Sequence, residues 1–397
     1  MAESGTLDIV SPQSAIARFR QLLLADNFLA EQLGEIERPD IFIAAALAIA
    51  SERRTALTAD ELESALQGGA GHKPLVPEPL DRWPAPGWAP GRSARGCTEP
   101  AFDWFWPGGQ AKFTSFYEDR VRCAWNRPLN RLVRTRTSLD QLVAGAVKQE
   151  AGRPDGFIFH MSRCGSTLLA RLLAQLEGSV VLSEPEPLDA LVQWAARADL
   201  PRANSALQAM VTALGRDLCG RKSHFFIKLD SWHAPALPLF RAAFPGVPWL
   251  FLYRDPVEVM ASHLFVPGRH VARGALADEI LGIEAGEFIS REDYCARALA
   301  KICGAVLGNW RPDEGLLVNY SEIQGAIPKR VCDHFGLQPT RAESAAVAAA
   351  ATLHSKSGAN FTSDRLAKRA AASDQVRKAV RDHLLPVFHR LQDVRLD

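Results

Sequence analysis

Short apolar runs alternate with amphipathic stretches over the second half of the chain. The apolar runs, which resemble strands, are 157–161, 180–182, 225–229, 249–253 and 316–318. The stretches between them repeat apolar residues at helical spacing near 167–177, 187–197, 204–219, 234–243, 256–264 and 291–308. This alternation predicts an α/β fold, a parallel sheet flanked by helices on both faces. Ligands of such sheets bind at the carboxyl ends of the strands, so the residues after each run are the functional candidates.

The first part of the chain follows other patterns. Residues 12–68 predict small helices, and Thr58 with Glu61 forms a capping box ahead of one of them. Residues 69–92 hold six prolines and predict a linker or irregular arm instead of a packed element. The aromatic-rich stretch 101–125 follows. We favour packing of its rings as core over the alternative of a substrate-facing wall.

These patterns divide the chain into three parts. We expect a small helical segment over 1–68, a Pro- and Trp-rich linker and arm over 69–150, and an α/β domain over 151–397. The net charge of +1 gives no general attraction to nucleic acid. No apolar stretch is long enough to span a membrane, and the first residues do not read as a secretory signal. Seven cysteines without a CxxC pair argue against a disulfide framework and a zinc ribbon, so we expect a cytoplasmic protein.

A compact polar loop, Ser-Arg-Cys-Gly-Ser-Thr at 162–167, joins the strand-like run to the next helix. It predicts an anion site, because the N–H groups of the first helical turn and the helix dipole face such a ligand. Ser166 and Thr167 add hydroxyl donors, and Arg163 adds a forked charge suited to phosphate or sulfate. The loop lacks the GxxxxGK[ST] pattern and its lysine, which counts against ATP or GTP. The alternative is an ordinary strand–turn–helix with a capping serine.

A second basic position follows the run 249–253. Arg254 opens an Arg-Asp-Pro sequence, and Ser262 returns a hydroxyl two helical turns later. We expect these two side chains to hold a second phosphate beside the first. The alternative is a surface arginine paired with Asp255. Two such elements, about 90 residues apart and each at the end of a strand of one sheet, support each other.

Both elements resemble those of sulfotransferases that use 3′-phosphoadenosine 5′-phosphosulfate (PAPS). Residues 163–169 are similar to the 5′-phosphosulfate loop of that family and differ at Cys164, where the family usually has serine. The spacing of Arg254 and Ser262 is similar to the family's 3′-phosphate element. The later stretch 316–337 also resembles the family, and the similarity covers about residues 155–390.

The resemblance implies a P-loop-type sheet and PAPS as the cofactor, with 3′,5′-adenosine bisphosphate (PAP) as its product. It implies transfer of a sulfuryl group to an acceptor hydroxyl, less readily to an amine. The acceptor, a small molecule, a lipid or a peptide, and the oligomeric state stay open. The residues that would bind the nucleotide are Arg163, Cys164, Gly165, Ser166, Thr167, Leu168, Arg254, Ser262, Tyr320 and Lys356.

The resemblance also suggests catalytic roles. Glu184 is our candidate for the base that takes the acceptor proton, with Glu186 and His233 as rivals. Both glutamates could instead cap the helix that follows them. Lys228, at the end of a buried run, would stabilise the bridging oxygen together with Arg163. These cations leave no need for a metal.

Two further functions compete with sulfuryl transfer. One is a nucleotide-dependent kinase, which the absent Gly-Lys pair and the lack of a clear magnesium-binding aspartate disfavour. The other is an inactive nucleotide-binding module, which the retained Glu184 and Lys228 disfavour. The segment 265–274 combines glycines with three basic residues, and a lid that meets an acidic acceptor and a plain solvated loop fit it equally.

Overall fold

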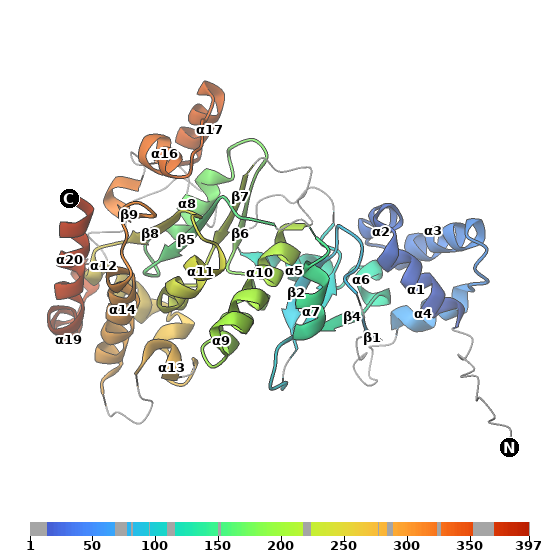
Figure 1. The fold of residues 1–397 in the computed structure, drawn as a ribbon, viewed down its shortest axis with the longest axis horizontal. Helices are drawn as coiled ribbons and strands as arrows, with labels where there is room; N and C mark the ends of the chain where they lie inside the picture. The colour runs from blue at the N-terminus through green and yellow to red at the C-terminus, as the bar shows by residue number, and fades with distance from the viewer. Residues whose placement is uncertain are drawn as a thin grey trace, which may run out of the picture.

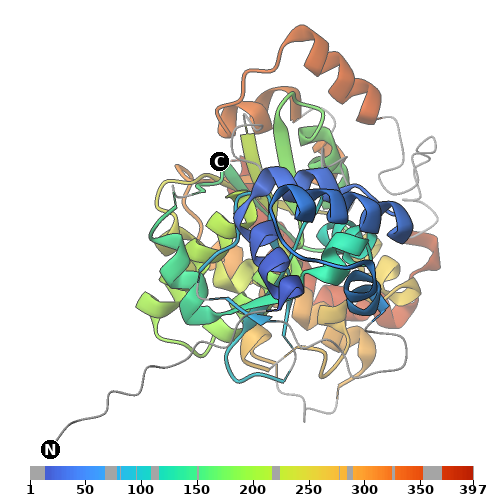
Figure 2. The same ribbon diagram turned by 90° about the vertical axis from the view of Figure 1, so that its right-hand side faces the viewer.

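The computed structural model of the chain describes residues 14–67, 78–80, 82–94, 96–108, 116–149, 152–216, 224–276, 278–283, 289–323, 327–351 and 369–396. Figure 1 shows the N-terminal helices at one end, a small sheet in the middle, and a larger sheet within the C-terminal half. Figure 2 views the molecule from the end that carries the N-terminal helices.

The larger sheet has five parallel strands in the order β6-β7-β5-β8-β9 (Figure 1). The strands are β5 (Gly156–His160), β6 (Ser179–Ser183), β7 (His224–Lys228), β8 (Trp249–Tyr253) and β9 (Gly315–Asn319). From β5 the chain goes to the edge strand β6, returns to β7 beside β5, and then crosses to the other side to form β8 and β9. Ligands of such sheets bind at the carboxyl ends of the strands, where the order reverses. The predicted α/β fold with a parallel sheet is confirmed.

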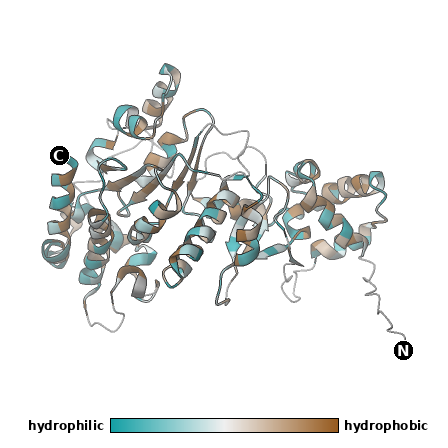
Figure 3. Ribbon diagram, viewed as in Figure 1, coloured by the Kyte–Doolittle hydropathy of each residue, from teal (hydrophilic) through white to brown (hydrophobic). Residues whose placement is uncertain are grey.

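Side chains of the strands alternate between two cores. Phe157 and Phe159 of β5 pack on one face, where both rings contact Phe240 of α11 (Leu237–Ala243). Ile158 between them belongs to the opposite core, together with Leu169 of α8 (Ser166–Leu173). Because both faces are covered, the strands are apolar nearly throughout, as Figure 3 shows by colour. This explains why the strands appear in the sequence as continuous apolar runs.

Helices and tight turns connect the strands and cover both faces. They are α8 (Ser166–Leu173), α9 (Glu186–Ala195), α10 (Leu200–Arg216), a 3₁₀ turn (Ser231–Ala236), α11 (Leu237–Ala243), α12 (Pro256–Phe265), a 3₁₀ turn (Arg269–Val271), α13 (Asp278–Leu281), α14 (Arg291–Gly308) and a 3₁₀ turn (Tyr320–Glu322). The C-terminal part adds a π-helical turn (Ile327–Val331), α16 (Cys332–His334), α17 (Arg341–Ala351), α19 (Asp374–Ala379), a second π-helical turn (Val380–Leu384) and α20 (Leu385–Leu396). The predicted helices are present, but some bounds differ: α8 ends at Leu173 and not near 177, residues 234–236 belong to a 3₁₀ turn, and α10 begins four residues early. There Asp199 accepts a hydrogen bond from Arg202 N at 3.0 Å, which favours an earlier start.

The N-terminal part is helical, as predicted. Its helices are α1 (Ala15–Ala25), α2 (Asn27–Gly34), α3 (Pro39–Glu52) and α4 (Ala59–Gln67). The capping box ahead of α4 is present: Thr58 N donates to Glu61 Oε2 at 2.9 Å, and Glu61 N donates to Thr58 Oγ1 at 3.3 Å. No helix within the described ranges is long and apolar enough to cross a membrane.

The middle part corrects one prediction. Residues 82–92 are not an irregular linker, because Trp88 is fully buried and Ala89–Ser93 forms β2. This strand pairs with β3 (Ala101–Phe105) at the edge of a sheet of order β1-β4-β3-β2. Pro90 is tolerated because the strand lies at the edge and its register shifts there. The other elements are β1 (Glu78–Pro79), β4 (Thr135–Ser138), α5 (Tyr117–Trp125), α6 (Pro128–Leu132) and α7 (Leu139–Ala146).

Most rings of the aromatic-rich stretch are core, as predicted. Buried rings there include Phe102, Trp104, Phe105, Trp106 and Tyr117. They belong to one continuous core that runs from the N-terminal helices to the C-terminal domain. The division into parts at residues 68 and 150 stays a prediction.

Candidate active site

The polar loop between β5 and α8 has a strained backbone. Ser162 and Arg163 have positive φ values of 78° and 50°, and Gly165 follows at 90° as the N-cap of α8. Non-glycine residues rarely adopt positive φ, and such strain gathers at binding sites. A side chain at position 165 is excluded as well, because a Cβ there would lie 2.6 Å from ring atoms of Tyr320. The loop is therefore shaped as a backbone cradle in front of a helix N-terminus.

The loop residues that we expect to bind an anion differ in their solvent exposure. Ser166 and Thr167 are 6% and 8% exposed, and Leu168 is 7% exposed, all in the first turn of α8. Arg163 is half-buried, and its Nη2 donates to the carbonyl of Val266 at 2.6 Å. This contact ties the loop to the end of α12 and to the segment 265–274. Phe265 and Val266 in that segment are exposed, and whether it closes as a lid stays open.

Cys164 points away from the loop surface. Its side chain is fully buried, and Sγ lies 3.2 Å from the carbonyl of Leu252 in β8. Burial raises the pKa of its thiol to about 12, so the thiol stays protonated. Any contact of this residue with an anion would thus come from its backbone N–H.

Arg254 is not a surface residue paired with Asp255. It is 6% exposed, and its Nε donates to Glu258 Oε2 at 2.7 Å, one turn along α12. Glu258 also accepts a hydrogen bond from Arg369 at 3.1 Å, while Asp255 pairs with Arg369 instead. The guanidinium of Arg254 is thus held by a buried carboxylate, which fixes its direction.

Tyr320 joins the two predicted anion-binding elements. Its ring lies against Gly165 of the loop, and the guanidinium of Arg254 lies 4.2 Å from the ring centroid. Tyr320 follows β9, so three neighbouring strands contribute to one cluster at the sheet edge. Ser262 is half-buried further along α12. Lys356 lies outside the described residues.

Glu184 and Lys228 form a buried ion pair. Lys228 Nζ donates to Glu184 Oε1, and Glu184 N donates to the carbonyl of Lys228 at 2.7 Å. Lys228 is fully buried at the end of β7, and the side chain of Glu184 is 23% exposed. Glu184 also has a positive φ of 54°, which makes it a third strained residue at this edge.

His160 completes this group from the end of β5. Its Nδ1 accepts a hydrogen bond from Ser162 N at 3.1 Å, and its Nε2 lies 3.4 Å from Glu184 Oε1. Burial lowers the pKa of His160, so its ring is neutral. Burial alone would raise the pKa of Glu184, but the ammonium of Lys228 and the neighbouring His160 lower it below its usual range. Glu184 is therefore ionised while Lys228 lies beside it.

A cavity of about 620 Å³ opens beside this pair. Its lining comes from the small sheet and α5 as well as from the parallel sheet: Arg92, Ser93, Phe116, Glu118, Glu184, Glu186, Asp189, Asp230, Trp232 and Arg269. The volume is that of an ordinary small-molecule site. The cavity contains both glutamates that the sequence suggested as the base.

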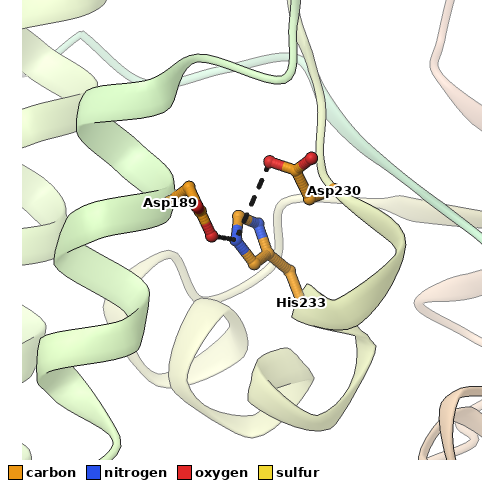
Figure 4. A group of neighbouring side chains, drawn as sticks. All are labelled: Asp189, Asp230 and His233. Carbon is orange, nitrogen blue, oxygen red and sulfur yellow. Dashed lines mark hydrogen bonds and ion pairs between the residues drawn. The ribbon is translucent and has the colours of Figure 1, made fainter. Parts of the chain in front are cut away.

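The rivals of Glu184 are engaged by other groups. Glu186 accepts hydrogen bonds from Ser93 N and Oγ at 2.7 and 2.5 Å. His233 is buried and does not line the cavity, and its Nε2 is 3.0 Å from Asp189 (Figure 4). Of the three, Glu184 alone contacts the lysine that ends β7.

Sequence reasoning missed several cavity residues. Asp189 lies in the first turn of α9 and belongs to no motif of the sequence. Arg269 lies in the basic segment 265–274, where the sequence suggested a lid or a solvated loop but no contact with Asp189. Arg92, Ser93 and Phe116 come from the part of the chain interpreted as an arm. Phe116 is the ring that fits the alternative of a substrate-facing wall. The spacing of aromatic residues did not distinguish it from the buried rings around it.

One group of side chains within the described ranges has the geometry of a metal site: Asp189, Asp230 and His233. Asp189 already accepts hydrogen bonds from Trp232, His233, Gln193 and Arg269 at 2.7–3.1 Å. These four donors occupy the lone pairs that a metal would need. This group of side chains therefore does not fit a metal-binding site.

No protein-family model matches the chain, and no curated protein matches it. Solved structures with a similar fold include several sulfotransferases. Sulfotransferase STF9 from Mycobacterium avium is 14% identical and matches 63% of this chain and 78% of its own, with a TM-score of 0.38. A sulfotransferase from Alicyclobacillus acidocaldarius is 15% identical over 61% and 96%, also at 0.38. Mouse sulfotransferase SULT7A1 complexed with PAP is 11% identical over 64% and 88%, at 0.33. These values are too low to assign a function to the chain.

Proposed function

We propose that the protein is a sulfotransferase that moves a sulfuryl group from PAPS to an acceptor hydroxyl. The observation that carries this proposal is the Tyr320 cluster, in which one ring contacts both Gly165 of the loop and Arg254. This contact supports the idea that the two predicted anion-binding elements, about 90 residues apart, act together at the carboxyl ends of the strands. A ligand with phosphate groups at both ends of one nucleoside fits this arrangement.

The residues on the nucleotide side suit PAPS better than ATP. The 5′ end would bind to the N–H groups of residues 164–167 and the hydroxyls of Ser166 and Thr167. The 3′-phosphate would bind to Arg254, with Ser262 and Lys356 as further candidates. The loop lacks the lysine of the Walker type, which would contact the β- and γ-phosphates of ATP.

PAPS supplies the transferable sulfuryl group. Glu184 would take the proton of the acceptor hydroxyl, whose oxygen forms the new bond to sulfur. The bond between sulfur and the bridging oxygen of the 5′-phosphate breaks at the same time, and PAP leaves. Lys228 would stabilise the negative charge that develops on the leaving oxygen. The contact between Glu184 and Lys228 would couple these two roles. When Lys228 moves from Glu184 toward the anion, the pKa of Glu184 would rise and its carboxylate would become a better base.

Nucleotide preference tests the proposal first. In EDTA, PAP should raise the melting temperature of the full chain, whereas ATP with magnesium should have little effect. A larger stabilisation by ATP–magnesium would favour the kinase. Mass spectrometry of metabolite extracts incubated with the protein and PAPS should then reveal a product with an added sulfate.

A matched pair of variants assigns the base. Glu184→Gln and Glu186→Gln each remove one carboxylate from the same cavity wall. Glu184→Gln should keep PAP affinity and lose turnover by about a hundred-fold or more, and Glu186→Gln should retain much more of it. The opposite ranking would move the base to Glu186. Full turnover in both would move it to His233.

A further inference from the structure

The cavity beside Glu184 is rich in carboxyl groups. Its lining holds five of them and two guanidinium groups: Glu118, Glu184, Glu186, Asp189 and Asp230 against Arg92 and Arg269. The whole chain is nearly neutral, so this excess of acid is a local property. An anionic acceptor would meet repulsion in such a cavity.

Three of the five carboxylates have cationic partners within the protein. Glu184 contacts Lys228. Glu118 lies 3.2 Å from Arg92, and Asp189 lies 3.1 Å from Arg269. These pairs also use both arginines of the lining, so neither arginine is a ready site for an anionic group.

The remaining two, Glu186 and Asp230, have no lysine or arginine within 4 Å among the described residues. Glu186 is hydrogen-bonded to Ser93 only through neutral donors. Asp230 is 7% exposed, and no described residue donates a hydrogen bond to its carboxyl group. The nearest basic side chain among the described residues is that of His233 at 4.0 Å, and its ring already shares a hydrogen bond with Asp189 (Figure 4).

A buried carboxyl group without a partner is costly. Burial raises the pKa of Asp230 well above its usual value, and the charges of Glu184 and Asp189 raise it further. A cation in the cavity would remove this cost. Trp232 and Phe116 also line the cavity, and aromatic faces attract cations where carboxylates attract them too.

We propose that the acceptor carries a positively charged ammonium group, which binds at Asp230 and Glu186 while its hydroxyl faces Glu184. This inference rests on the proposed sulfotransferase function. It names the class of substrate, a hydroxyl compound that bears an amine. The charged amine is a recognition group, because a protonated nitrogen has no lone pair with which to attack sulfur.

Three phenols of similar size and different charge test the inference. Tyramine carries an ammonium, 4-ethylphenol is neutral, and 3-(4-hydroxyphenyl)propanoate carries a carboxylate. Calorimetry with the full chain saturated with PAP should show that tyramine binds at least about ten-fold more tightly than either of the others. Asp230→Asn keeps the side-chain shape and should reduce this preference to about two-fold.

Asp60→Asn is the matched control, because it removes one exposed carboxylate that lies outside the cavity. It should leave the preference unchanged. PAP affinity of Asp230→Asn reports that the variant is folded. Equal or weaker binding of tyramine than of 4-ethylphenol would overturn the inference, as would undetectable binding of tyramine at about 10 mM. A preference that survives in Asp230→Asn and in Asp230→Asn/Glu186→Gln would overturn it too. Failure of PAP to bind the wild-type chain would instead count against the proposed function.

Discussion

The two halves of the strand-end edge are built from opposite charges. On the side of β5, β8 and β9, the groups are a helix N-terminus, Arg163 and a buried Arg254. On the side of β6 and β7, the cavity is lined by five carboxyl groups and two arginines. The Glu184–Lys228 pair lies where the acidic cavity begins.

The halves also differ in how their groups are held. The basic half relies on backbone, with positive φ at three loop residues and one arginine fixed by Glu258. The acidic half relies on side chains, two of which have no cationic partner among the described residues. Fixed donors suit a constant part such as a nucleotide, while unpaired carboxylates suit a charged acceptor. Under the proposed function, the comparison implies that opposite charges at one sheet edge separate the nucleotide from the acceptor.

The largest expected effect comes from the residue at the boundary. Lys228→Met should lower turnover by about a hundred- to a thousand-fold, because it removes the cation proposed for the leaving oxygen. It should also raise the pKa of Glu184, since Lys228 now lowers it, so the acidic limb of the pH–rate profile should move to higher pH. Lys301→Met, at an exposed lysine, is the control. An unshifted limb would mean that the pair is structural.

Asp230→Asn should stabilise the ligand-free protein at neutral pH, by about 1 kcal/mol or more. The pKa of Asp230 is raised in the folded state, so the unfolded state loses its proton first as the pH rises. Wild-type stability should therefore fall relative to the variant as the pH rises above about 4, until the folded pKa is passed. Denaturant titrations at several pH values measure this gap. A gap that is constant with pH would show that Asp230 has a partner.

The smallest effect is expected within the basic half. Cys164→Ser should change PAP affinity by less than about two-fold, because the side chain is buried against the carbonyl of Leu252. Its raised pKa should also make the thiol of the folded protein slow to alkylate. A ten-fold gain in affinity on introducing serine would place this side chain in the anion site, contrary to the comparison.

The basic half could be predicted from the sequence, because its parts are local. A buried strand, a polar loop and a helix follow one another at residues 156–173, and Arg254 directly follows a second strand. The partner of Arg254 could not be predicted with the same ease. Asp255 is the neighbour in sequence, but the i,i+4 position on α12 brings Glu258 to the guanidinium.

The acidic half could be predicted only in part. Glu184 and Glu186 follow a strand and were therefore candidates, but Ser93 and Phe116 reach the cavity from a small sheet and its neighbouring helix. Pro-rich spacing suggested a linker there, although Trp88 is fully buried and β2 pairs at a sheet edge. Ser93 and Glu186 are 93 residues apart in sequence, and their contact depends on how the small sheet packs against the α/β part. No local sequence pattern predicts such packing.

The central claim is that the loop and Arg254 bind opposite ends of one nucleotide. Calorimetry in EDTA with PAP and with adenosine 5′-monophosphate, which lacks the 3′-phosphate, tests it in the wild type and in Arg254→Ala. The account predicts that the wild type binds PAP about a hundred-fold more tightly, and that Arg254→Ala loses most of this ratio while its affinity for the monophosphate stays within about two-fold. Equal affinities of the wild type for the two nucleotides, or a ratio unchanged in Arg254→Ala, would contradict it.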